Sequence, residues 1–181
     1  MATLAKWSIA DYHKMIAAGI LSDRNIQLID GELVEMSPEG IIHAAYGGSI
    51  ADYLRQTLLG KAWIREAHPI TVDNSEPEPD VAVVKLPKNK YFQNHPSFQD
   101  IYWLIEIADT TLNYDLNRKK EIYAAAAIAE YWVVDVKGKK LTVFTQPTNN
   151  DYLLKSELKE GTIQPISFPN ISISINKLFE Q

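Results

Sequence analysis

Two carboxylates stand at the ends of two strongly apolar segments of the sequence. Asp80 begins the run DVAVV, and Glu106 lies near the end of the run IYWLIEIA. If these segments pair as neighbouring antiparallel strands, the start of the first lies beside the end of the second. Carboxylates at the ends of buried strands need a partner or a metal ion, and they are suited to Mg²⁺ or Mn²⁺. The pair therefore predicts a divalent metal site.

A lysine is expected to reach the same place from the next helix. Asp115, Lys119 and Tyr123 are spaced four residues apart and share one helical face. In phosphodiester hydrolysis, such a lysine orients or activates the attacking water and stabilises the charge that develops on phosphate. Asp115 is either the N-cap of this helix or a partner of Lys119. Tyr123 is expected to pack in the core with its hydroxyl group reaching the site.

Read singly, each member of this set has an ordinary interpretation. Asp80 after Pro79 is then a turn residue, Glu106 an edge carboxylate, and Lys119 one member of a solvated basic face. The three together, at these positions, favour the functional interpretation.

Further candidates carry weaker signals. His43 could hydrogen-bond near the site or bind the metal, although a lone helical histidine more often makes a plain polar contact. Lys85, Lys88 and Lys90 form a basic run in the loop between the two carboxylate strands, and they are candidates for phosphate contacts. A solvated loop is the equal alternative. Glu78 could approach the metal, with a solvated carboxylate as the better expectation.

Composition sets the class of protein. The 181 residues, of which 46% are hydrophobic and 23% charged, predict one globular domain, residues 1–181, with a well-formed core. The absence of cysteine excludes disulfides, zinc–thiolate sites and a cysteine nucleophile. No segment has the pattern of a leader or of a membrane-spanning helix, so a cytoplasmic protein without membrane contact is expected. The net charge of −5 argues against a broad nucleic-acid-binding surface but allows a local one.

The pattern of apolar residues predicts helices around a sheet. Ser8 and Asp11 indicate a capped helix through Met15 to Ile20, and the Asp30-Gly31 turn indicates a hairpin. A long helix is expected from Pro38 to about Leu59, and another from Asp115 to about Ala127. Strands are expected in AWIRE, PITVD, DVAVV and IYWLIEIA, and in EYWVVDV and LTVFTQ around Gly138, followed by two short strands and a helical turn near Leu178.

The segments EPEPDVAVV and IEIADTTLNYDLNRKKEIYAAAAIAEYWVVD, with IDGELVEMSPEGIIHAA upstream, carry a resemblance to a known family. They resemble the bacterial restriction-endonuclease family called Uma-two, within the PD-(D/E)xK nuclease superfamily, and the resemblance implies that the core of the nuclease domain spans about residues 26–136. The resemblance implies that Asp80 and Glu106 are the metal-binding carboxylates and that the carbonyl group of Ile107 also faces the metal. Ala108 stands where the superfamily has the lysine of its ExK motif, and the resemblance suggests that Lys119 supplies the amine instead.

Together these observations predict an α/β restriction-endonuclease-like fold, a central mixed β-sheet flanked by helices. The expected function is Mg²⁺-dependent or Mn²⁺-dependent endonucleolytic hydrolysis of DNA, by a homodimer because a two-fold assembly suits cleavage of two strands. Two alternatives stay open: a catalytically silent interaction module with a nuclease fold, and a metal-dependent hydrolase of RNA or of another phosphate ester.

Overall fold

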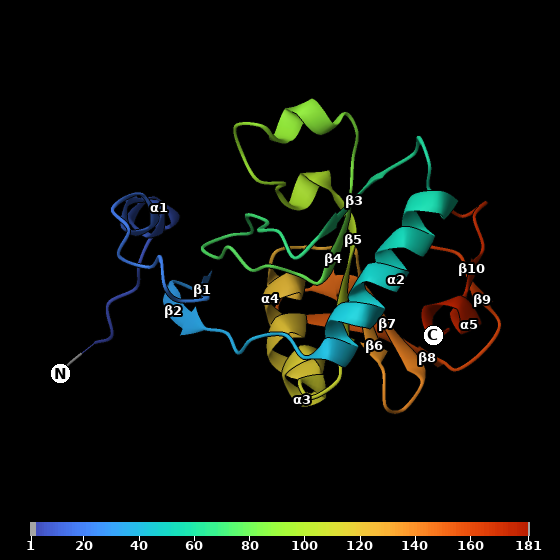
Figure 1. Ribbon diagram of the computed structural model, residues 1–181. Helices are drawn as coiled ribbons and strands as arrows, with labels where there is room; N and C mark the ends of the chain where they lie inside the picture. The colour runs from blue at the N-terminus through green and yellow to red at the C-terminus, as the bar shows by residue number, and fades with distance from the viewer. Residues whose placement is uncertain (1–2, 181) are drawn as a thin grey trace.

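A six-stranded sheet forms the centre of the molecule, in a computed structural model that describes residues 3–180. The strands lie in the order of the sequence, and only β5 and β6 are parallel. Their bounds are β3 Trp63–Glu66, β4 Val81–Val84, β5 Ile101–Ala108, β6 Glu130–Asp135, β7 Lys140–Thr148 and β8 Asp151–Leu158. The mixed sheet with helices around it confirms the predicted fold class (Figure 1).

Helices cover both faces of this sheet (Figure 1). One face packs against α2, Ile41–Thr57, and α5, Ile175–Leu178, in a core that includes Trp103 and Trp132. The other packs against α4, Lys120–Ala125, in a core that includes Tyr123 and Tyr131. The strands β4, β5 and β6 are buried along nearly their whole length, as their continuous apolar runs predict. These strands can therefore hold polar side chains in fixed positions.

The N-terminal part adds a helix and a hairpin beside the sheet. The helix α1 spans Ile9–Ala17, and the side chain of Ser8 accepts a hydrogen bond from the Asp11 amide, as the capping pattern predicts. The hairpin consists of β1, Ile26–Ile29, and β2, Glu32–Glu35. Both turn residues have positive φ, 50° at Asp30 and 73° at Gly31, which is the conformation expected of an Asp-Gly turn. Short elements complete the chain: η1 Lys88–Tyr91, η2 Phe98–Asp100, β9 Thr162–Ile163 and β10 Ile173–Ser174.

Three predictions about elements were wrong. The segment PITVD forms only isolated bridges, in which Thr71 and Val72 take part, because it turns back on itself at residues 72–75. The helix expected to begin at Asp115 begins three residues earlier, as α3 Leu112–Tyr114, and continues through a π-helical turn η3, Asp115–Lys119. Asp115 is therefore not an N-cap. The C-terminal part contains the eight-residue strand β8 besides two short strands, because β8 pairs along β7.

No helix within residues 3–180 is long and apolar enough to cross a membrane.

Candidate active site

The register of the sheet places the two predicted carboxylates opposite each other. Val81 of β4 pairs with Ile105 of β5, so Asp80, one residue earlier, stands across from Glu106. Cross-strand neighbours have Cβ atoms about 5 Å apart. Because side chains alternate along a strand, Asp80 and Glu106 share the face of the sheet that packs against α4. The structure thus brings together the two residues that the sequence analysis selected.

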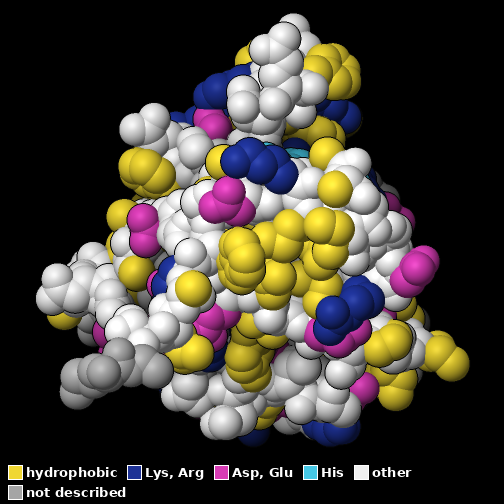
Figure 2. Space-filling model, turned by 90° about the vertical axis from the view of Figure 1, so that its left-hand side faces the viewer, with side chains coloured by type: hydrophobic (Ala, Val, Ile, Leu, Met, Phe, Trp, Pro, Cys, Tyr) yellow, Lys and Arg dark blue, Asp and Glu magenta, His cyan; other side chains and the backbone are white. Residues whose placement is uncertain are grey.

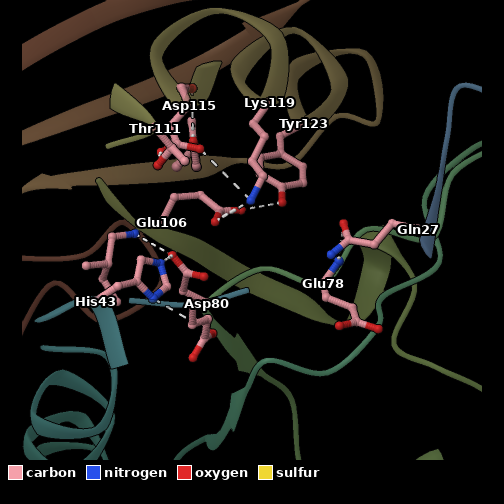
Figure 3. A network of polar contacts seen from close by, with 12 residues as sticks. Gln27, His43, Glu78, Asp80, Glu106, Thr111, Asp115, Lys119 and Tyr123 are labelled. Carbon is pink, nitrogen blue, oxygen red and sulfur yellow. Dashed lines mark hydrogen bonds and ion pairs between the residues drawn. The ribbon is translucent and has the colours of Figure 1, made fainter. Parts of the chain in front are cut away.

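Asp80 is held from two directions (Figure 3). Its Oδ2 accepts a hydrogen bond of 2.9 Å from the ring of His43 on α2 and one of 2.6 Å from the backbone N–H of Ile107. Burial raises the pKa of Asp80, but the hydrogen bond from His43 and the charge of Lys119 outweigh burial, so that its pKa is lowered. The same bond raises the pKa of His43. Asp80 is therefore an ionised carboxylate at neutral pH.

Glu106 is the most enclosed acid of the site, with 1% of its surface exposed. Oε2 accepts a hydrogen bond of 2.6 Å from the Lys119 ammonium, and Oε1 accepts one of 2.6 Å from the Tyr123 hydroxyl group. Burial raises the pKa of Glu106 to about 8, against the opposing effect of Lys119. Burial therefore makes this carboxyl group more difficult to ionise than a glutamate in water.

Lys119 reaches Glu106 from the π-helical turn. In a π-helical turn the hydrogen bonds join residues five positions apart, so Asp115 and Lys119 lie nearly above each other along the helix. The Nζ atom of Lys119 lies 4.0 Å from Oδ1 of Asp115. Burial lowers the pKa of Lys119, but the three surrounding carboxylates raise it above its ordinary value. Ala108 is buried on β5, two residues after Glu106. The helix therefore provides an amine at Glu106, where the strand has only Ala108.

Asp115 lies behind this lysine instead of capping the helix. Its Oδ2 accepts a hydrogen bond of 2.6 Å from the Thr111 hydroxyl group, and its backbone carbonyl accepts one of 3.0 Å from Tyr131. Burial raises the pKa of Asp115 as well. The open alternative from the sequence is thereby resolved: Asp115 is a buried partner of Lys119.

Glu39, immediately before the N-cap of α2, adds a possible metal ligand. Glu39, His43 and Asp80 each offer one ligand atom, and these atoms lie within 4.8 Å of one another, the one such group of three or more among the residues described. Nδ1 of His43 is buried without a hydrogen-bond partner and lies 3.8 Å from Glu39. Since Nε2 donates to Asp80, a neutral ring has its lone pair on Nδ1. The carboxylate oxygens of this set suit Mg²⁺ or Mn²⁺, and the imidazole nitrogen suits a transition metal such as Zn²⁺.

These groups line one cavity with a volume of about 480 Å³. Its walls come from β1 and β2, the segment that leads into α2, and the segment from Asp109 into η3. Asp80, Glu106, Asp115 and Lys119 lie on its wall, as does Glu78, whose pKa burial raises. Figure 3 shows Asp80, His43, Glu106 and Lys119 turned toward one space, with Glu78 to one side.

The three lysines of the basic run are not brought to this cavity. Asp80 precedes the first residue of β4 and Lys85 follows the last, so the run begins at the opposite end of the strand. Lys90 forms an ion pair with Asp100, and Lys88 lies 5.6 Å from the centre of the Trp63 ring.

Comparison with known proteins identifies the family. The family model Uma2, described as "Putative restriction endonuclease", matches residues 9–176. The chain belongs to the Uma2 family. Membership of Uma2 supports a nuclease function. A solved structure with the same fold is described as "a putative nuclease belonging to DUF820" from Anabaena variabilis ATCC 29413. It has a TM-score of 0.62 and 14% identity, covering 85% of this chain and 89% of that one. None of the curated proteins matches the chain.

Two polar residues of this Uma2 site were not found from the sequence. Glu39 stands four residues before His43, a spacing that places two side chains on one side of a helical turn, and this signal could have indicated it. Thr111 was hidden because the helix was expected to begin at Asp115. A threonine just before a helix is a common cap signal, and here its hydroxyl group binds the Asp115 carboxylate.

Proposed function

We propose that this Uma2 protein is a PD-(D/E)xK endonuclease that uses Mg²⁺ or Mn²⁺ to hydrolyse phosphodiester bonds of DNA. One observation supports the proposal above the others: Asp80 and Glu106 face each other on adjacent strands, with the Lys119 ammonium 2.6 Å from Glu106, on the wall of one cavity. Two carboxylates and a lysine around a space for phosphate are the groups that metal-assisted phosphodiester hydrolysis requires.

The residues present fit a divalent cation. Asp80 and Glu106 would hold it, with the carbonyl group of Ile107, and His43 and Glu39 offer further ligand atoms on the other side of Asp80. The orphaned Nδ1 of His43 and the burial-raised pKa of Glu106 both indicate a site that lacks positive charge. When bound, the ion would activate a water molecule as the nucleophile and would act as a Lewis acid on the phosphate oxygens.

The protein groups around the ion have distinct roles in the proposal. Lys119 stays protonated because its pKa is raised, so it stabilises negative charge on the phosphate and does not remove a proton from water. Tyr123 and Lys119 orient the Glu106 carboxylate, and Asp115 holds Lys119 in place. His43 orients Asp80 through its hydrogen bond.

Cleavage of supercoiled plasmid with Mg²⁺ or Mn²⁺ tests this proposal. The wild-type protein should convert the plasmid to open-circular and linear forms, and Asp80→Asn, Glu106→Gln and Lys119→Met should each lower the rate at least 100-fold. Single-stranded DNA and RNA of equal length, assayed beside the plasmid, decide the substrate. Analytical ultracentrifugation of the same protein sample measures its molecular mass and so tests whether it is a homodimer.

Glu130→Gln is the matched control, because Glu130 is also a carboxylate with 1% exposure but does not line the cavity. Under conditions in which the Glu130→Gln variant is folded, it should cleave DNA at the wild-type rate. Wild-type protein that leaves DNA and RNA intact with both metals, or Asp80→Asn protein that cleaves normally, would overturn the nuclease assignment.

A further inference from the structure

A second cluster of charge lies at the other end of β4 from the cavity. Lys85, Lys88 and Lys90 follow the end of β4, and Arg65, opposite Ala82 on β3, lies over the Trp63 ring that Lys88 also approaches. Among the residues described, Asp100 is the one acid that pairs with any of these four cations. The cluster thus has a net charge of about +3, four cations less one carboxylate, in a chain whose net charge is −5. A local excess of this kind attracts an anionic partner.

Arg65 is the unusual member of the cluster. The other arginines, Arg24, Arg55 and Arg118, pair with carboxylates and have side chains 41–55% exposed. Arg65 has 6% of its surface exposed, no ion pair within residues 3–180, and a buried Nε without a hydrogen-bond partner. Its contacts are the Pro69 carbonyl and the Trp63 ring. A buried guanidinium that is left without a counter-ion is costly, so a bound anion would relieve it.

Aromatic side chains accompany these cations. Tyr91 stacks on Trp63 with ring centres 5.6 Å apart, and the next residue, Phe92, is 86% exposed. An aromatic ring so exposed has no role in the core, and its neighbours Lys88 and Lys90 are exposed as well. Figure 2 shows Lys and Arg side chains beside hydrophobic ones at the top of the molecule, the height at which η1 stands in Figure 1. Flat rings between lysines are the elements of a surface that stacks unpaired bases and contacts their phosphates.

We propose that Arg65, Lys85, Lys88, Lys90, Tyr91 and Phe92, the basic–aromatic corner, bind a single-stranded stretch of the nucleic acid that the cavity cleaves. The inference rests on the proposed function for its substrate, but the binding itself needs no cleavage. Asp80 and Lys85 are five residues apart along an extended strand, about 17 Å, which an extended stretch of a few nucleotides can span. The corner would then hold an unpaired end while the adjoining phosphodiester lies in the cavity.

Fluorescence anisotropy in EDTA tests the proposal, with a labelled oligothymidylate of 15 nucleotides and a duplex of the same length as probes. The wild-type protein should bind the single strand more tightly than the duplex. Phe92→Ala should weaken binding of the single strand about tenfold, as loss of one stacked base predicts, and should leave duplex binding nearly unchanged. Lys88→Ala should lower the slope of log affinity against log salt by about 0.7 for the single strand.

Matched controls lie at the far edge of the sheet and beyond it. Leu153→Ala removes an apolar side chain that is 67% exposed on β8, and Lys159→Ala removes an exposed lysine just after β8. Both should bind the oligonucleotide as the wild type does. The proposal would be overturned if Phe92→Ala weakened binding of the single strand and of the duplex equally, or weakened neither. It would also be overturned if the control variants lost as much affinity as Phe92→Ala. Binding to vesicles of anionic lipid without binding to the oligonucleotide would also overturn it, in favour of a membrane surface.

This experiment separates the two proposals. Binding that depends on Phe92 but is never followed by cleavage with metal would contradict the nuclease proposal and support the corner. If cleavage depends on Asp80 but Phe92→Ala leaves oligonucleotide binding unchanged, the nuclease proposal would be supported and the basic–aromatic corner contradicted. Because Phe92 and Lys88 are exposed, both variants should unfold at the wild-type urea concentration, which confirms that a loss of binding is local.

Discussion

The stability of the metal-free protein should depend on pH through Glu106, and Glu106→Gln should remove that dependence. Burial raises the pKa of Glu106 from its ordinary value of 4.5 to about 8. A carboxyl group whose pKa is higher in the folded protein than in the unfolded chain holds an additional proton after folding. Its stabilising effect is complete below pH 4.5 and is lost as pH rises through about 8.

The expected magnitude follows from this window. Between pH 4.5 and about 8, each pH unit should lower the free energy of unfolding by about 1.4 kcal/mol through this one group. Several kcal/mol of the free energy of unfolding therefore depend on the protonation of Glu106 across the window. The glutamine variant has no proton to lose, so its stability relative to the wild type should improve steadily as pH rises.

Urea unfolding in EDTA at pH 5, 6, 7 and 8 measures this difference. Glu121→Gln, on the same helix as Tyr123 but exposed, serves as the control and should differ from the wild type by no more than about 0.5 kcal/mol at each pH. A difference between Glu106→Gln and the wild type that stays constant from pH 5 to 8 would refute the reasoning. It would mean that Glu106 is already ionised at pH 5 and forms a full ion pair with Lys119.

Further predictions concern the partners of Glu106 and the metal. At pH 9, where Glu106 is ionised, Lys119→Met should lower the free energy of unfolding by about 3–5 kcal/mol. Lys120→Met breaks an ion pair whose other member, Asp151, is 64% exposed, and it should cost about 1 kcal/mol or less. Urea unfolding compares the two variants. Tyr123→Phe removes the hydroxyl group that donates to Glu106 and should cost about 1–3 kcal/mol in the same measurement. Mn²⁺ at 100 times its dissociation constant should stabilise the wild type by about 2.7 kcal/mol and release protons, seen by calorimetry in two buffers. EDTA should reverse that stabilisation.

The carboxylate pair could be predicted from the sequence because short apolar runs indicate the strands, and the alternation of side chains within each run indicates which face they occupy. Asp80 and Glu106 flank apolar runs that had to become neighbouring strands, and period-two alternation then placed both on one face. The lysine was also predictable, because a helix that directly follows a buried strand must pack back on the sheet. The hairpin at Asp30 and Gly31 was predictable for the same reason, since two adjacent residues determine the turn.

What could not be predicted depends on distant contacts. The π-helical turn over Asp115–Lys119 has no sequence signature of its own, and its Lys119 bonds Glu106, which lies 13 residues earlier in the chain. The sequence offered a hydrogen bond near the site as one role for His43, but its partner Asp80 is 37 positions away, so only the packing of α2 against the sheet identifies that partner. The segment PITVD has the composition of a strand, but Val72 pairs with Ser75 in a tight turn, so the segment forms only isolated bridges.

The charges in the cavity form an argument for a cation that is independent of the family. Burial raises the pKa of Glu78, Glu106 and Asp115, so three carboxyl groups on one cavity wall are more difficult to ionise than in water. Lys119 cannot neutralise all three, and His43 is engaged with Asp80. A fold whose only need was a stable core would replace such acids with apolar residues, because unpaired buried charges are costly. A divalent ion held by these residues would reverse this cost by favouring the ionised form of the carboxylates.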